Sequence, residues 1–323
     1  MSVASPRLGH GSSTGTFRLG HLALEARLGD PSHAAALGLL FRNEVHAEPE
    51  PRADGRLEMV EHDAGDWPDV PADGLVADEG PAGLIVATEV VFATLRRDPT
   101  PWSLIVRTRQ AQVADHVFRV HLSVVLHRLL LELGYLYLHA AAVSIRGRTH
   151  VFIGEKGAGK STLSLALARM GGTVLADDHV LLQRGEPRYL VSGCEATSRV
   201  TAETEAYVFP IPLPLPARDF AGTPKKELLI GDHFAAAPYE AHTIDAVYFP
   251  IVGARLRLDR LSPQQATLDL LARTRRSFRP QGRGDVTALL DFWSGLCESA
   301  PAFALELPPN LERLDGLPAL LFA

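Results

Sequence analysis

Residues 154–161 read Gly-Glu-Lys-Gly-Ala-Gly-Lys-Ser, a complete G-x-x-x-x-G-K-[ST] phosphate-binding loop. The motif works only where a strand passes into a helix. The apolar residues 151–153 precede it here, and a stretch typical of a helix, 162–170, follows it. Glycine lets the backbone turn tightly, so that main-chain N–H groups surround a phosphate chain at the helix N-terminus. The run therefore predicts a β–loop–α unit within an α/β domain.

This loop predicts a site for ATP and Mg²⁺. Lys160 is expected to reach the β- and γ-phosphates, and the hydroxyl of Ser161 is expected to coordinate Mg²⁺. The residues expected to contact the nucleotide are Gly154, Gly157, Ala158, Gly159, Lys160, Ser161 and Thr162.

Lysine usage indicates a second anion-binding patch. Of 32 basic residues only four are lysines, and the two outside the phosphate loop are Lys225 and Lys226. A chain that uses arginine almost everywhere keeps lysine where a compact ammonium is needed and a planar guanidinium does not fit. We therefore expect Lys225 and Lys226 to contact a nucleotide or substrate phosphate. A solvated pair of loop lysines is the alternative.

Composition disfavours several partners. The net charge of −6 and the pI near 6.1 disfavour nucleic acid and anionic membranes, and no apolar run is long enough to span a bilayer. Cys194 and Cys297 are too few for a disulfide framework or a cysteine metal site. These features favour a cytoplasmic protein. The sequence leaves open whether the chain forms a homo-oligomer.

The pattern of apolar residues predicts three regions. Residues 1–16 are expected to be a flexible tail, and residues 17–112 a small N-terminal α/β domain with strands at 18–28, 56–61, 84–95 and 103–109. Residues 113–323 are expected to form the ATP-binding catalytic domain, opening with a long helix at 114–133. Within it a strand is expected at 135–145, and helices are expected at 262–273 and 285–298. In that domain the proline-rich segment 210–216 is expected to be a loop or a docking segment.

Two acids and a histidine are candidates for chemistry beside the phosphate loop. Asp177 and Asp178 directly follow the apolar residues 173–176, so that segment is expected to be a buried strand that ends at the acids. Phosphoryl transfer needs a carboxylate that holds metal and a group that receives the proton of the acceptor. His139 lies in an otherwise apolar strand, where it is either a core side chain or a site residue.

These residues together resemble the catalytic domain of the HPr kinase/phosphorylase family. The similarity runs from Leu138-His139 through the phosphate loop to the segment 171–180, Gly-Gly-Thr-Val-Leu-Ala-Asp-Asp-His-Val. It implies a P-loop kinase domain of the HPr kinase and phosphoenolpyruvate carboxykinase type, and ATP-dependent phosphorylation of a serine hydroxyl. It also implies that Asp177 is the base, that Asp178 is its charged neighbour on the metal side with Ser161, and that His139 belongs to the site.

The chain also departs from that family. The family has an acidic residue directly after the loop serine, whereas this chain has Thr162 at that position. The family signature Gly-Arg-Gly-Pro-Gly-Phe-Met-Glu is also absent. The expected function is therefore that of a divergent kinase acting on a serine or similar hydroxyl of a peptide or protein, for example in peptide tailoring. A kinase for a small molecule such as free serine, and a non-catalytic nucleotide-binding regulatory module, are the alternatives.

Overall fold

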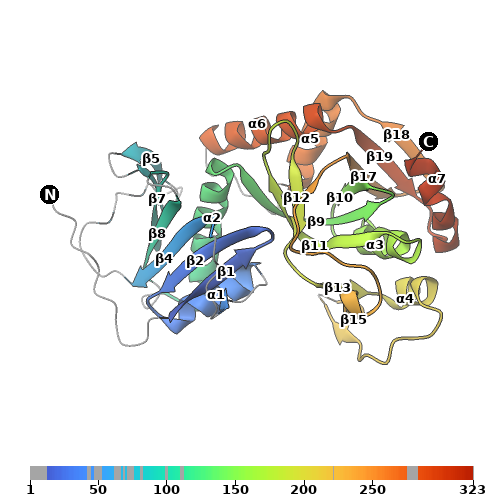
Figure 1. The fold of residues 1–323 in the computed structure, drawn as a ribbon, viewed down its shortest axis with the longest axis horizontal. Helices are drawn as coiled ribbons and strands as arrows, with labels where there is room; N and C mark the ends of the chain where they lie inside the picture. Colours follow the sequence, from blue (N-terminus) through green and yellow to red (C-terminus); the bar gives the residue numbers. More distant parts are fainter. Residues whose placement is uncertain are drawn as a thin grey trace. The chain divides into compact units, whose positions relative to one another are not determined.

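The computed structural model describes residues 13–41, 45–46, 53–61, 67, 70, 76–80, 83–98, 101–109, 113–220, 222–274 and 283–322. These residues form a mixed α/β protein of two compact units (Figure 1). One unit comprises residues 1–133 and 278–286, and the other comprises residues 134–277 and 287–323. Among the described residues, no helix is long and apolar enough to cross a membrane.

The first unit is built on an eight-stranded sheet with the strand order β3-β1-β2-β4-β8-β7-β6-β5. Alternating side chains of its strands are buried, as in β2, where Glu25 and Arg27 are exposed between buried neighbours. The strands are β1 Ser13–Leu19, β2 Leu22–Leu28, β3 Val45–His46, β4 Gly55–Glu61, β5 Val76–Gly80, β6 Gly83–Ala87, β7 Val91–Arg96 and β8 Trp102–Thr108, with helices α1 Pro31–Phe41 and α2 Asp115–Glu132.

Several boundaries in this unit differ from those expected. Residues 13–16 of the predicted tail belong to β1, while residues 1–12 lie outside the described part. The predicted strands 18–28 and 84–95 are each an antiparallel pair, β1–β2 and β6–β7. Helix α2 belongs to the first unit, because it packs against β6, β7 and α1. The observed division therefore lies at residues 133/134 rather than at the predicted 112/113.

The second unit carries the phosphate loop on another eight-stranded sheet, with the order β16-β12-β11-β9-β10-β17-β19-β18. Its strands are β9 Tyr135–Ile145, β10 Arg148–Ile153, β11 Thr173–Gln183, β12 Leu190–Gly193, β16 His242–Thr243, β17 Ala246–Val252, β18 Arg257–Arg260 and β19 Ala302–Leu307. Helices α3 Lys160–Arg169, α4 Ala202–Val208, α5 Pro263–Thr274 and α7 Leu317–Leu321 also occur, with 3-10 helices at Ile230–Asp232 and Leu311–Gly316. Most of helix α6 Arg283–Ser299 belongs to this unit as well. A small sheet of β13 Thr197–Val200, β15 Pro224–Leu229 and β14 Arg218–Asp219 accompanies α4.

Strand register places the acid pair beside the phosphate loop. Strand β9 lies between β10 and β11 and is antiparallel to both. Ala140 of β9 pairs with Ile153, the last residue before the loop, and on its other side with Asp178. Contrary to expectation, the strand does not end at the acids: β11 runs on to Gln183, and Asp178 has a φ of 104° within it.

The core of this unit joins α3 to the sheet. Leu163, Ala166 and Leu167 of α3 are fully buried against Val143, Phe152 and Leu305 of the strands. Burial of this apolar face holds the helix N-terminus, and with it the loop, at a fixed place over the sheet. The proline-rich segment 210–216 lies outside the helices and strands, which confirms the predicted loop. Its Leu213 is buried against residues of α3 and α4.

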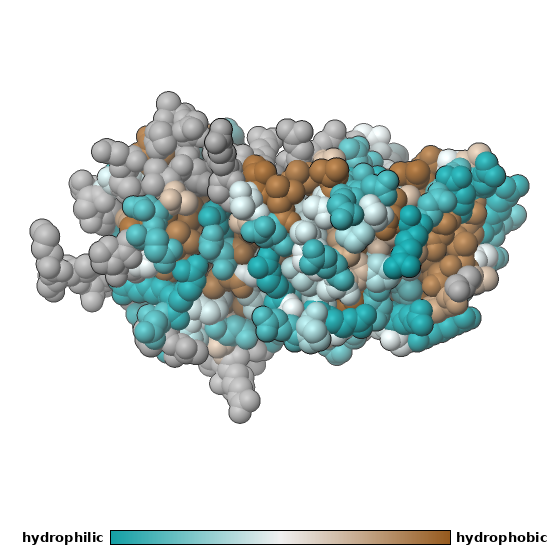
Figure 2. Space-filling model, turned by 90° about the horizontal axis from the view of Figure 1, so that it is seen from above, coloured by the Kyte–Doolittle hydropathy of each residue, from teal (hydrophilic) through white to brown (hydrophobic). Residues whose placement is uncertain are grey.

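Hydrophobic side chains also reach the surface, where they form separate patches on the face drawn in Figure 2. The large ones that are exposed include Leu39, Val120, Ile211, Ile251, Val252 and Leu268. Scattered exposed apolar residues are usual in soluble proteins. An exposed apolar residue therefore indicates a function only where it lies beside a candidate site.

Candidate functional site

The loop between β10 and α3 turns and packs at its glycines. Gly157 and Gly159 have φ values of 86° and 90°, in the left-handed region that favours glycine. A Cβ atom on Gly154 would lie 3.2 Å from Ala158 and 3.3 Å from Pro250, so the loop packs closely at its start. The sequence therefore places glycine where the chain must turn sharply or pack tightly.

The loop closes around Lys160. Its side chain is 6% exposed, and its Nζ donates hydrogen bonds to the carbonyl oxygens of Gly154 at 2.8 Å and Glu155 at 3.0 Å. Burial lowers the pKa of Lys160 to about 8, although Asp177 and Asp178 act in the opposite direction. The ammonium thus lies at the centre of the loop, within the field of both acids.

Asp177 is buried behind the loop among serine hydroxyls. The residue is 1% exposed, and it accepts hydrogen bonds from Ser164 at 3.3 Å, from Ser198 and from Ser161 of the loop. Burial raises the pKa of Asp177, and these hydroxyls partly offset the shift. The carboxylate and the Ser161 hydroxyl together form an oxygen pair of the type that Mg²⁺ prefers.

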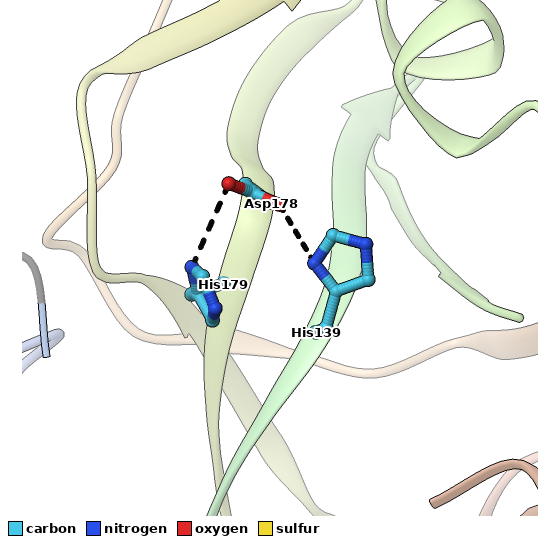
Figure 3. Close-up of side chains that lie close together, drawn as sticks. All are labelled: His139, Asp178 and His179. Carbon is cyan, nitrogen blue, oxygen red and sulfur yellow. Dashed lines mark ion pairs between the residues drawn. The ribbon is translucent and has the colours of Figure 1, made fainter. Parts of the chain in front are cut away.

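Asp178 has a different environment, because its side chain is partly exposed. It lies between two histidines (Figure 3): Nδ1 of His139 is 2.7 Å from one carboxylate oxygen, and Nδ1 of His179 is 3.9 Å from the other. Arg199 from β13 donates to the second oxygen at 3.0 Å. The positive φ of Asp178 departs from regular strand geometry at the point where its side chain meets both rings.

The three side chains His139, Asp178 and His179 also offer ligand atoms close enough together to hold a metal ion. The Nδ1 atom of each histidine already has a carboxylate partner, Asp178 for His139 and, at 2.5 Å, Glu195 for His179. The cluster therefore works as it stands as a hydrogen-bonded network that fixes the orientation of Asp178.

Partners from distant parts of the sequence complete this network. Arg199 also donates to Glu227 at 3.0 Å, and its guanidinium lies 4.6 Å from the ring centroid of Phe220. Sequence reasoning missed His179, Glu195, Ser198 and Arg199. Only His179, next to the acid pair, carried a signal in the sequence, since the others are brought in by β13 and the chain leading to it.

Lys226, Lys225 and Thr162 are the remaining candidate residues. Lys226 pairs with Glu205 at 2.8 Å and donates to the carbonyl of Leu213 at 2.7 Å, so its ammonium ties α4 to the proline-rich segment. Lys225 is near enough to Lys160 to help lower its pKa. The hydroxyl of Thr162 lies 2.8 Å from that of Thr204 in α4.

Comparisons with known proteins give likenesses among solved structures. No family model and no curated protein matches the chain. Among solved structures, that of the HPr(Ser) kinase/phosphatase from Coxiella burnetii is similar to it, with 12% sequence identity and a TM-score of 0.30, over 58% of this chain and 93% of that chain.

Proposed function

We propose that this chain is a Mg²⁺- and ATP-dependent kinase that phosphorylates a serine or similar hydroxyl on a peptide or protein. The observation that carries the proposal is the junction of the phosphate loop with the acid pair. Ser161 of the loop donates to Asp177, and both acids act on the buried ammonium of Lys160. A phosphate chain in the loop therefore has two carboxylates within its immediate surroundings, which is what phosphoryl transfer requires.

The described residues fit a nucleoside triphosphate. Lys160 donates to two carbonyl groups, which an incoming phosphate oxygen can replace as partners of the ammonium. A Cβ on Gly157 would meet nothing within 4 Å, so the outer side of the loop is open. Mg²⁺ held by Ser161 and Asp177 would neutralise part of the charge on the β- and γ-phosphate oxygens.

The two acids would then have different tasks. Asp177 is enclosed by hydroxyls and has little access to an acceptor, so we assign it to the metal side. Asp178 is partly exposed and oriented by His139, so we assign it to receive the proton of the acceptor hydroxyl. The sequence expectation was the reverse, with Asp177 as the base. Burial, which the sequence does not reveal, is the reason for the exchange.

A peptide or protein acceptor is favoured over a free amino acid. The arginine beside the acid pair, Arg199, already binds the carboxylates of Asp178 and Glu227. A free amino acid would have to compete with them for that guanidinium in order to bind through its own α-carboxylate.

The test is transfer of labelled γ-phosphate from ATP to a library of serine-containing peptides, with free serine and an acceptor-free reaction in parallel. Lys160→Ala is expected to abolish transfer, whereas Lys156→Ala, which removes an exposed ammonium from the same loop, is expected to retain most of it. Transfer to free serine alone would identify a small-molecule kinase. Tight ATP binding without any phosphorylated product would identify a regulatory module.

A further inference from the structure

The side of the phosphate loop away from the acids is formed by the ends of two strands. Strands β17 and β19 are parallel to β10, so the carboxyl ends of all three lie at the edge that carries the loop. The loop packs against both ends. Gly154 lies beside Pro250, and a Cβ on Gly159 would lie 3.1 Å from a methyl carbon of Leu307.

An exposed apolar side chain lies at this edge. Val252 is 68% exposed, and it pairs in register with Leu307. It is two residues beyond Pro250 and four beyond Tyr248, which packs with α3. Because alternate residues of a strand share a face, Val252 belongs to the face of the sheet that carries α3 and the loop. We call Val252, together with the buried Pro250 and Leu307 beside it, the apolar ledge.

The backbone that follows the ledge is held firmly. The N–H of Gly253 donates to the carbonyl of Leu307 at 2.8 Å. The carboxylate of Glu306 accepts from the N–H groups of Ala254 at 2.7 Å and Arg255 at 3.2 Å. These bonds fix the end of β17, so Val252 is presented to solvent from a defined position.

We infer that the apolar ledge is the subsite for the base of the nucleotide, an inference that rests on the function proposed above. In parallel α/β sheets, ligands lie across the carboxyl ends of neighbouring strands. The acids fix the γ-phosphate end of the chain on the side of β9 and β11, so the nucleoside extends toward β17 and β19. A base is a flat ring with large apolar faces, and packing it on Val252 removes exposed apolar surface from water.

The experiment compares MgATP with magnesium tripolyphosphate, which has the phosphate chain and no nucleoside. Binding of each to wild type, Val252→Ser and Val252→Leu is measured by isothermal titration calorimetry. Val252→Ser is expected to weaken MgATP about tenfold, equivalent to about 1.4 kcal/mol, and to leave tripolyphosphate unchanged. Val252→Leu is expected to bind MgATP at least as tightly as wild type.

The matched control is Leu268→Ser, which removes a 64% exposed apolar side chain from α5 and is expected to change neither affinity. A Val252→Ser variant that binds MgATP like wild type, or that loses tripolyphosphate to the same extent, would overturn the ledge and leave the kinase proposal standing. A wild-type protein that binds neither compound would overturn both.

Discussion

The Nδ1 atom of His139 lies 2.7 Å from a carboxylate oxygen of Asp178, on the neighbouring strand of the sheet. This contact holds the carboxylate in one orientation and stabilises the charge that it carries. If Asp178 receives the proton of the acceptor, loss of the imidazole should slow the chemical step more than it weakens nucleotide binding.

We therefore predict that His139→Asn lowers kcat about 10- to 100-fold, less than the roughly 10²- to 10⁴-fold that a general acid or base itself contributes, with little change in the Kd for MgATP. Steady-state kinetics measures the change in kcat, and titration calorimetry measures the Kd for MgATP. His233→Asn, which alters an exposed histidine elsewhere in the unit, serves as the control. A His139 variant with normal kcat and weakened MgATP would place the histidine in nucleotide binding instead.

The acid pair gives a second prediction, which separates the two roles. Asp178→Asn should lower kcat by about 10²- to 10⁴-fold while MgATP binding persists. Asp177→Asn should instead raise the Mg²⁺ concentration needed for half-maximal activity, because the buried residue pairs with Ser161. Both variants are near-isosteric, and thermal unfolding checks their folding. The opposite pattern would restore Asp177 as the base.

Nucleotide binding should depend on pH through Lys160. Because burial lowers the pKa of Lys160 to about 8, its ammonium loses a proton above that pH. Above pH 8, Lys160 must therefore take up a proton when an anionic ligand binds. The Kd for MgATP should rise about tenfold per pH unit above 8. Calorimetry at pH 9 in two buffers of different ionisation enthalpy should detect uptake of about one proton. A Kd that stays flat from pH 7 to 9.5 would contradict this assignment.

Acid should destabilise the fold through His150, which is 1% exposed and 3.0 Å from the hydroxyl of Tyr248. Burial lowers the pKa of His150 to about 4. Between pH 6.5 and 4 the unfolded chain binds a proton that the folded chain does not, so the stability due to the neutral ring is lost as pH falls. The expected loss is about 3 kcal/mol, from about 1.4 kcal/mol per unit of pKa difference.

Urea unfolding at pH 7.5 and 4.5 measures most of this loss, because the lower pH is still above the folded-state pKa of about 4. His150→Gln should reduce the difference in unfolding free energy between the two pH values, whatever its effect at neutral pH. His233→Gln, at an exposed position, should leave the difference as in wild type. An unchanged difference in the His150 variant would show that other groups cause the acid sensitivity.

Local patterns predicted most of the second unit. The strand Tyr135–Ile145 has the predicted bounds, and the predicted helices 262–273 and 285–298 correspond to α5 and α6. These segments have strong periodicity, so their type is readable without tertiary information. Helix α1 was not predicted, because its residues from Pro31 to Phe41 are mostly alanine and leucine, without a distinct polar face.

The candidate site was readable only in part. The loop and the acid pair are contiguous motifs, whereas Ser198 and Arg199 reach Asp177 and Asp178 through the packing of β13, 21 residues further along the chain. Nor does the sequence show which aspartate is enclosed. That difference arises from the positive φ at Asp178 and from the serines gathered around Asp177.

Strand β9 acts as a spacer of fixed width between β10, which leads into the phosphate loop, and β11, which carries the acid pair. Inserting or deleting one residue within it would turn Ala140 and its neighbours to the opposite face and carry His139 away from Asp178. The tip of the hairpin at Arg146-Gly147 lies beyond the paired residues Ile145 and Arg148, so a longer turn there can leave the pairing of Ala140 in place. Relatives that keep this chemistry should therefore vary in length at the tip and keep the interior of the strand constant.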